Sequence, residues 1–370
     1  MEIFRPFGCD KTLALITLAL LAVGFIMVFS SSAVLAEEKY HQSLYFLIQQ
    51  LIGAGAGLAV LLFLLTIRKP FFQNPFFVSG LLLLTLFLLV LCFLMPPVAR
   101  TNRWVQILDI RFQPSELAKI SLVLFLAFYL EKKVSRLAEW RTLLLPIFVI
   151  SLFVLLILKE PDFGTGLLVF FICILMLYLG GVRLRYLVLL GLVAACVFAF
   201  FLFQASYRLE RIAGFMEPEK DPLGKSFQVN QSKLAVGSGG LLGLSLGQST
   251  QKLYFLPCAH TDFIYAILGE EFGLLGTLTI LLLFFAFLWR GLAISARAPT
   301  LAGQLTAAGL TLVICVQAFL NISIVLGLGP AKGVPLPLIS FGRSSLIMNL
   351  AAIGIILNIS QRRSLERKGR

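Results

Sequence analysis

Residues 13–36 read LALITLALLAVGFIMVFSSSAVLA, an apolar run without a charged side chain. A helix needs about 20 such residues to cross the hydrocarbon core of a bilayer. Similar runs recur at about 45–67, 76–95, 114–131, 143–159, 163–181, 186–203, 262–289, 302–328 and 342–360. Because they are continuous rather than alternating, they predict helices and not the strands of a β-barrel. The expected fold is an all-α polytopic membrane protein with about ten transmembrane helices.

Composition agrees with this fold class. Hydrophobic residues make up 59% of the chain and charged residues 13%, and the mean hydropathy of +0.95 is far above that of soluble domains. No appended soluble domain and no repeat at a fixed period is present, so residues 1–370 are expected to form a single integral membrane domain. The first run is too long for a signal-peptide core, which indicates a retained anchor.

The basic residues predict the orientation. Seventeen lysines and arginines fall in the loops and tail of one side, and seven in the short loops of the other. The positive-inside rule then places both termini in the cytoplasm, with a tail at about 361–370 and a long outer loop at about 204–261. The formal net charge of +13 reflects this topology and contact with anionic membrane lipid, and not a nucleic acid partner.

The most unusual polar residues lie at the outer end of the eighth run. Residues 256–273 read LPCAHTDFIYAILGEEFG and gather His260, Asp262, Glu270 and Glu271. A carboxylate inside a membrane costs roughly 2.5–3.5 kcal/mol, so such groups usually face a cavity and often do chemistry. The structural alternative is that Thr261 or Asp262 only caps a helix that begins at Phe263.

Two further acidic motifs face the same side. In residues 111–119, Glu116 and Lys119 are three positions apart, so they share a helix face and can pair. They form either a self-neutralised pair or a charged wall of an outward-facing cavity. Asp162, in the short turn 159–165, either caps the next helix or adds its charge to the site.

The outer loop supplies cations. Arg208, Arg211 and Lys233 would give an anionic substrate several charged partners. The glycine- and serine-rich run 237–249 could bind a phosphate through its N–H groups or be a flexible turn, but no Walker lysine follows it. The six cysteines show no metal-binding spacing. Residues 330–345 read as a re-entrant or broken start of the last helix.

An enzyme on the outer face has no ATP, so its substrate must carry its own activation. A lipid-linked diphosphate fits, because its leaving group needs cations or a metal and its acceptor hydroxyl needs a carboxylate base. The four outer clusters contain both kinds of group.

The motifs resemble the SEDS family of bacterial shape and division proteins along nearly the whole chain. They are RFQPSELAK (111–119), EPDFGT (160–165), DPLG (221–224), QSKLAVGSGG (231–240), LPCAHTDFI (256–264) and KGVPLPLIS (332–340). The FtsW-type division branch is the nearer likeness than the RodA-type elongation branch, and a sporulation paralogue would suit the same residues. Cys258 and Arg343 depart from the family pattern.

The resemblance implies a glycosyltransferase that polymerises lipid II into a glycan strand with a cognate class B penicillin-binding protein and other divisome proteins. It implies that Asp262 is the catalytic base, and we hypothesise that a divalent cation, Mg or Mn with unknown ligands, assists the leaving group. The expected substrate-binding residues are Arg111, Glu116, Lys119, Asp162, Arg208, Arg211, Lys233 and His260, with Glu270 and Glu271 as structural support. A lipid II flippase and a non-catalytic scaffold are the alternatives.

Overall fold

The computed structural model describes residues 9–67, 71–96, 102–107, 110–204, 206–216, 226–253, 256–257, 259–330 and 333–368. Within these ranges the chain forms twelve α-helices, two short 3-10 helices and one β-hairpin. The DPLG motif at 221–224, Cys258 and Lys332 lie outside the described residues.

The helices begin and end close to the predicted boundaries. The α-helices are α1 (Lys11–Tyr40), α2 (Tyr45–Thr66), α3 (Pro75–Leu94), α4 (Pro114–Lys132), α5 (Trp140–Lys159), α6 (Phe163–Leu179), α7 (Leu184–Phe203), α8 (Ser206–Met216), α9 (Phe227–Ser238), α10 (Ile264–Ser295), α11 (Leu301–Val325) and α12 (Arg343–Lys368). The short elements are η1 (Phe71–Gln73), η2 (Val134–Arg136), β1 (Val105–Ile107) and β2 (Ile110–Phe112). Each predicted span coincides with one helix, and α8 and α9 lie in the predicted outer loop.

Eight of these helices are long and apolar enough to cross a membrane, counted over the described residues. The two remaining predicted spans fail that test for physical reasons. α6 has 17 residues, and α4 carries four charged side chains within its 19 residues. The fold is an all-α polytopic membrane bundle, as predicted.

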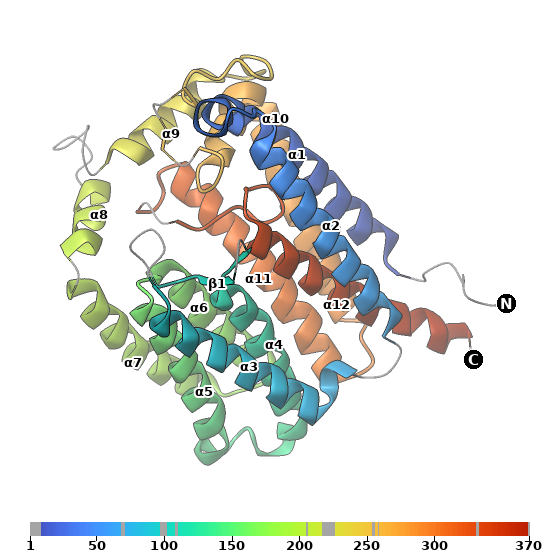
Figure 1. The fold of residues 1–370 in the computed structure, drawn as a ribbon. Coiled ribbons are helices and arrows are strands. Elements are labelled where there is room, and N and C mark those ends of the chain that lie inside the picture. The colour runs from blue at the N-terminus through green and yellow to red at the C-terminus, as the bar shows by residue number, and fades with distance from the viewer. Residues whose placement is uncertain are drawn as a thin grey trace.

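α11 forms the centre of the bundle, with α4, α6, α10 and α12 packed around it (Figure 1). Its most apolar stretch is 72% buried, whereas that of α7 at the rim is 17% buried. α2 and α12 run side by side along one edge. At their contact the stem of Arg343 packs against Gly53, where a Cβ would lie 3.2 Å from it. We call the end of the bundle where α10 begins and α11 ends the Asp262 end.

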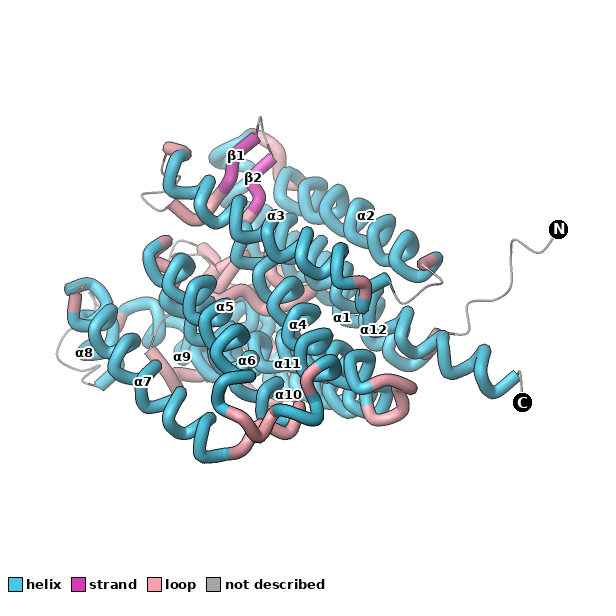
Figure 2. Tube along the Cα trace, turned by 90° about the horizontal axis from the view of Figure 1, so that it is seen from below, coloured by secondary structure: helices cyan, strands magenta, loops and turns pink. Residues whose placement is uncertain are grey.

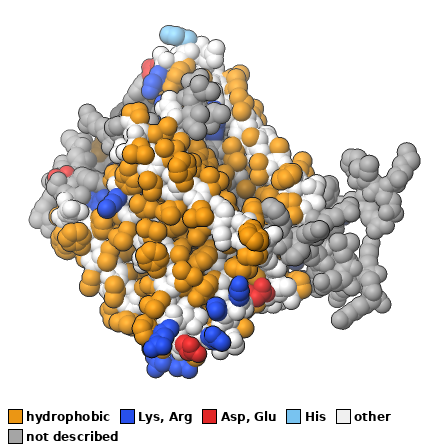
Figure 3. Space-filling model, turned by 60° about the horizontal axis from the view of Figure 1, so that its bottom comes forward, with side chains coloured by type: hydrophobic (Ala, Val, Ile, Leu, Met, Phe, Trp, Pro, Cys, Tyr) orange, Lys and Arg blue, Asp and Glu red, His pale blue; other side chains and the backbone are white. Residues whose placement is uncertain are grey.

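The outside of the bundle is apolar. Figure 3 shows one face covered mostly by hydrophobic side chains, with lysines and arginines gathered toward one edge. Large side chains such as Phe63, Leu83 and Trp289 are more than half exposed. A continuous apolar surface of this kind marks contact with lipid rather than with water.

Both ends of the described chain lie at the end opposite Asp262 (Figure 1). The Asp10 N–H donates to Ser360 Oγ at 3.0 Å, which ties the start of α1 to α12. Asp10 also caps α1 by accepting from the Leu13 N–H, and Arg290 Nη2 of α10 lies 2.6 Å from its carboxylate.

α10 is broken at Gly273, whose φ of 64° and ψ of −158° are essentially restricted to glycine. The break frees backbone groups, and the loop after α9 pairs with them. Leu244 N donates to Glu270 O at 3.0 Å, and Leu274 N donates to Gly240 O at 2.9 Å. Gly273 therefore serves this turn.

The hairpin of β1 and β2 was not predicted from the sequence. It lies at one edge of the bundle (Figure 2) and pairs Gln106 with Arg111 in antiparallel register. Each strand has three residues, which is too short for a two-residue periodicity to stand out. The hairpin leads directly into Pro114, the first residue of α4.

Candidate functional site

Asp262 lies in the short segment before α10, and its side chain is half-buried. The side-chain amide of Asn321 on α11 donates to the Asp262 main-chain oxygen at 2.7 Å. The structural alternative, in which Thr261 or Asp262 caps a helix starting at Phe263, is wrong. α10 starts one residue later, its N-cap is Phe263, and no side chain makes a cap bond there.

A non-helical segment, residues 333–342, precedes α12 and lies against the Asp262 segment. Ser340 Oγ donates to Thr261 O at 2.5 Å, and Phe341 N donates to His260 O at 3.0 Å. Gly333 lies beside the carboxylate, because a Cβ on it would lie 3.1 Å from Asp262 Oδ2. This is the broken helix start that the sequence predicted.

The electrostatics around Asp262 favour a carboxyl that titrates near neutrality. Burial raises the pKa of Asp262 to about 6; the charges of Arg103 and Arg211 oppose this rise and that of Asp162 adds to it. Arg211 was predicted to bind substrate, whereas Arg103 was not among the predicted site residues. The signal for Arg103 was its position in a polar segment before α4.

The turn between α5 and α6 places Asp162 beside this cluster. Asp162 is buried and caps α6, accepting from Thr165 N at 3.2 Å, as one of the two interpretations predicted. Gln113 Nε2 also donates to Asp162 Oδ2 at 3.1 Å, which links the starts of α4 and α6. Arg103 donates to the main-chain oxygens of Glu160 and Pro161. Asp162 is thus held by contacts within the protein, and its charge acts on Asp262.

Glu160, in the same turn, is a fully buried acid. Its side chain is 0% exposed, and neither carboxylate oxygen has a hydrogen-bond partner in the described part of the chain. Burial and the charge of Asp162 raise the pKa of Glu160 to about 8, against the opposing charge of Arg103. Glu160 is therefore held mostly as the neutral acid at neutral pH.

The Glu116–Lys119 pair forms as predicted, with 2.8 Å between Lys119 Nζ and Glu116 Oε1. Both side chains are 4% exposed. Lys119 also donates to Gln317 Oε1 at 2.6 Å, and Ser345 Oγ donates to Glu116 Oε2 at 3.1 Å. α11 and α12 cover the pair and use its polar atoms, which agrees with the self-neutralised pair of the two interpretations. The role of the two residues in binding substrate stays a prediction.

His260 lies between two aromatic rings, with centroid distances of 4.7 Å to Phe46 and 5.9 Å to Phe341. Burial, with the charge of Lys39, lowers the pKa of His260 to about 4. The imidazole is therefore neutral at physiological pH and packs against α2 and the 333–342 segment.

The predicted cations of the outer segments are spread over three elements. Arg208 on α8 donates to Phe201 O at 2.5 Å and lies 5.5 Å from the Phe163 ring. Lys233 on α9 is exposed, and its stem covers Gly327 at the end of α11. Arg111 on β2 is exposed. Of the described cations, Arg103 and Arg211 are those whose charges act on Asp262.

Glu270 and Glu271 lie inside the bundle, on the first turns of α10. Glu270 accepts from Ser249 Oγ and from the Thr250 N–H at 3.0 Å. Glu271 accepts from Ser30 Oγ at 2.6 Å and pairs with Lys252 Nζ at 2.8 Å. These contacts anchor the loop after α9 to α1 and α10.

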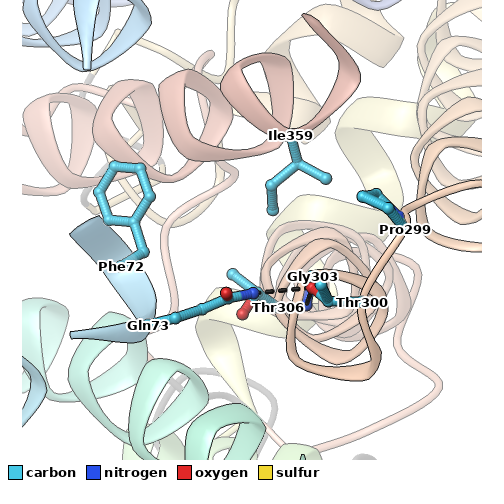
Figure 4. Close-up of a pocket in the computed structure, with 7 residues that line it drawn as sticks. All are labelled: Phe72, Gln73, Pro299, Thr300, Gly303, Thr306 and Ile359. Carbon is cyan, nitrogen blue, oxygen red and sulfur yellow. Dashed lines mark hydrogen bonds between the residues drawn. The ribbon is translucent and has the colours of Figure 1, made fainter. Parts of the chain in front are cut away.

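No group of three or more His, Cys, Asp and Glu side chains that could hold a metal ion occurs among the described residues. At the opposite end, Phe72, Gln73, Thr300 and Ile359 help to line a cavity of about 20 Å³, room for one water (Figure 4). Its Gly303 is roughly 27 Å from Asn321 along α11, given the helical rise.

A family model described as "Cell cycle protein" and named for FtsW, RodA and SpoVE matches residues 11–365. The chain belongs to the FtsW/RodA/SpoVE family. Membership agrees with the resemblance to SEDS proteins seen in the sequence motifs.

Relatives in this family match the chain along almost its whole length. Stage V sporulation protein E of Bacillus subtilis (strain 168) is 40% identical over 95% of this chain and 97% of its own. The probable peptidoglycan glycosyltransferase FtsW of Geobacter sulfurreducens is 38% identical over 95% of both chains.

Solved structures of the family share the fold. A chain from the structure "Structural coordination of polymerization and crosslinking by a peptidoglycan synthase complex" is similar with a TM-score of 0.78 and 29% identity, over 96% of this chain and 98% of that chain. The rod shape determining protein RodA of Thermus thermophilus is similar with a TM-score of 0.71 and 26% identity, over 96% of this chain and 97% of its own.

Proposed function

We propose that this member of the FtsW/RodA/SpoVE family is a peptidoglycan glycosyltransferase that polymerises lipid II during septal wall synthesis. The observation that carries the proposal is the Asp262 carboxyl. It is half-buried at one end of the bundle, its pKa is raised to about 6, and Arg103 and Arg211 act on it. A base with such a pKa is largely deprotonated at neutral pH and still accepts a proton readily.

In the proposed reaction, Asp262 takes the proton of the acceptor sugar's 4-hydroxyl. The resulting oxygen nucleophile attacks the anomeric carbon of the donor sugar, and the bond from that carbon to the diphosphate oxygen breaks with inversion. Undecaprenyl diphosphate leaves with the bonding electron pair, and Asp262 returns its proton to water. Glycan strand and lipid diphosphate are the two products.

The leaving group gains negative charge as the bond breaks, so it needs cations. The charges of Arg211 and Arg103 act on Asp262. Arg208 lies on α8 together with Arg211, and Lys233 lies on α9. Guanidinium groups bind phosphate oxygens with two parallel hydrogen bonds. We assign the diphosphate to this group of cations.

We further propose that a divalent cation, Mg or Mn, binds together with the substrate. Mg²⁺ is commonly held by one or two carboxylates plus substrate phosphates. No group of three or more His, Cys, Asp and Glu side chains that could hold a metal occurs among the described residues, so the ligands of the cation would come mainly from the diphosphate oxygens and water. The cation would supply charge neutralisation for the leaving diphosphate.

The membrane orientation belongs to the same proposal. The ends of α1 and α12 that meet at Asp10 and Ser360 would face the cytoplasm, and Asp262 would open to the outer face. This arrangement agrees with the excess of basic residues in the loops of the first side.

The proposed partner is a class B penicillin-binding protein within the divisome. Support comes from the similarity to a chain of a peptidoglycan synthase complex in which polymerisation and crosslinking are coordinated. The identities to a sporulation protein and to an FtsW, 40% and 38%, are similar, so we assign division by the sequence motifs. Elongation, as for RodA, is the alternative role.

A lipid II flippase is the competing activity, and it would need charged groups along the path to the inner leaflet. The buried charged residues of the described chain are Glu116, Lys119, Glu160, Asp162, Glu270 and Glu271. All of them lie at the Asp262 end, within the first turns of α4 and α10 or beside the start of α6. This distribution favours chemistry at one face over transport across the membrane.

The test is polymerisation of lipid II by the chain in complex with its penicillin-binding protein. We expect glycan strands from the wild type and none from Asp262→Asn. Glu139→Gln removes an exposed carboxylate at the opposite end and serves as the matched control with wild-type activity. A wild-type rate in Asp262→Asn would show that Asp262 is not the base. The absence of product from an intact wild-type complex would contradict the proposed activity.

A further inference from the structure

Two buried amide side chains follow one another on one face of α11, near Asp262. Gln317 and Asn321 are four residues apart, so they lie on one face of the helix, and each is 1% exposed. Gln317 Nε2 donates to Pro335 O at 2.9 Å. Asn321 Nδ2 donates to Val334 O and to Asp262 O, both at 2.7 Å. Polar side chains inside an apolar helix are retained only where they make such bonds.

The two amides connect different parts of the protein. Gln317 joins the buried Lys119 to the 333–342 segment, because its oxygen accepts from Lys119 Nζ at 2.6 Å. Asn321 uses both donor hydrogens on main-chain oxygens of two separate segments, which it fastens to each other. Its own oxygen has no partner in the described part of the chain, so the two donor contacts are what holds this side chain in place.

The two segments that Asn321 bonds, one with Asp262 and one with Val334, come together beside the Asp262 carboxylate. Gly333 precedes Val334, and a Cβ at Gly333 would lie 3.1 Å from Asp262 Oδ2. A Cβ there would be closer than an ordinary van der Waals contact, so the space beside the carboxylate is the space that a glycine leaves, and it depends on the separation of the two segments. The bonds of Asn321 hold the two segments at this separation.

We propose that Asn321 is a positioning residue for the glycosyl transfer, which fixes Asp262 against residues 333–335 and so sets where the carboxylate meets the acceptor hydroxyl. The inference rests on the proposed function and assigns no contact between Asn321 and substrate. A misplacement of about 1 Å in a catalytic group can lower the rate a hundredfold.

The chain offers a matched control in Asn358 on α12. Asn358 is 2% exposed, and its Nδ2 donates to two main-chain oxygens, Leu64 O and Ile67 O, both at 2.8 Å. Its side-chain oxygen is also buried without a partner among the described residues. The two asparagines therefore make the same kind of clamp, one beside Asp262 and one at the opposite end of the bundle.

The experiment compares Asn321→Ala with Asn358→Ala in the complex with the penicillin-binding protein, using purified lipid II. We expect similar losses of thermal stability in the two variants, because each loses two buried hydrogen bonds. Only Asn321→Ala should lower kcat, by about tenfold to a hundredfold, with KM within about twofold. Equal kcat losses in both variants, or a wild-type kcat in Asn321→Ala, would overturn the positioning role.

The acid limb of the pH–rate profile of Asn321→Ala shows whether the variant changes the surroundings of Asp262 or only the stability of the protein. The described charged groups that act on Asp262 are Arg103, Arg211 and Asp162, and none of them is changed in these variants. Release of Asp262 toward water in Asn321→Ala should move the limb to lower pH, because burial is what raises the pKa of Asp262. An unmoved limb would count against the proposal.

Gly333→Ala tests the same contact from the other side, in case Asn321→Ala fails to fold. Gly333 is exposed, so a methyl group there leaves the packing of the bundle intact. The methyl crowds and dehydrates Asp262 Oδ2, so the limb should move to higher pH while kcat falls. A wild-type profile in Gly333→Ala would contradict the proposal, whereas a wild-type complex without any product would contradict the proposed function instead.

Discussion

Lys119 Nζ lies 2.8 Å from Glu116 Oε1, one turn away on α4, and α11 and α12 enclose both side chains. The pair also bonds Gln317 and Ser345, so it joins three helices below the Asp262 segment. A charge left alone in such a place has neither water nor a counterion.

Loss of one member of this pair should therefore be far more harmful than loss of both. We expect Lys119→Met to lower the free energy of unfolding by about 3–5 kcal/mol. The double variant Glu116→Gln with Lys119→Met should recover most of that stability, because no buried charge remains. Thermal unfolding of the purified variants in detergent measures the difference, and equal midpoints for the single and double variants would contradict a buried ion pair.

Glu160 should make the protein less stable as the pH rises. Its pKa is about 8 in the folded chain and lower when unfolded, so the folded state binds more protons between these values and its stability falls through that window. Glu160→Gln should remove this dependence and raise the melting temperature at pH 8 by about 2–4 °C. Melting curves at acid and alkaline pH check this, and a lower melting temperature for Glu160→Gln at alkaline pH would show that the charged form is stabilised.

The rate of polymerisation should rise with pH through about 6, the pKa of Asp262, and then level off, since a base acts in its deprotonated form. Arg211→Gln should move this limb to higher pH, because the charge of Arg211 lowers the pKa of Asp262. Initial rates with saturating and with dilute lipid II give the two profiles. An unmoved limb in Arg211→Gln would show that the charge of Arg211 does not act on Asp262.

Gly273→Ala should destabilise the protein by about 1–3 kcal/mol, because its backbone conformation is essentially restricted to glycine. A Cβ there would also collide with the backbone of Leu241 and Gly243, so the loop after α9 should detach from α10. Limited proteolysis across residues 241–253 and thermal unfolding report the two effects. Gly55→Ala is the control, since a Cβ at this helical glycine meets nothing within 4 Å and should be neutral or stabilising.

The positions of the spans could be predicted because helix formation in a membrane depends on local sequence. Without water, every backbone group must bond within its own segment, so apolar length alone locates a helix. The cap made by Asp162 and the pair of Glu116 with Lys119 were predicted for the same reason, since each involves residues within one helical turn.

The roles of single polar residues at the site could not be predicted in this way. The sequence left open whether Glu116 and Lys119 form a self-neutralised pair or a cavity wall, because their burial depends on α11 and α12, which come some 200 positions later along the chain. Arg103, Gln317 and Asn321 were missed because their partners lie in remote segments. Gln317 and Asn321 did carry a signal, being two amides four residues apart in an otherwise apolar run.

The sequence by itself determined the all-α membrane fold, the family and the choice of Asp262, because each depends on local pattern or on motif identity. Tertiary structure alone decided that Asp262 does not cap α10, that Asn321 holds it, and that Arg103 and Arg211 set its charge environment. The physical reason is that burial and electrostatic contact depend on which segments meet in space. Four separate stretches of the chain must come together before the Asp262 carboxyl has its properties.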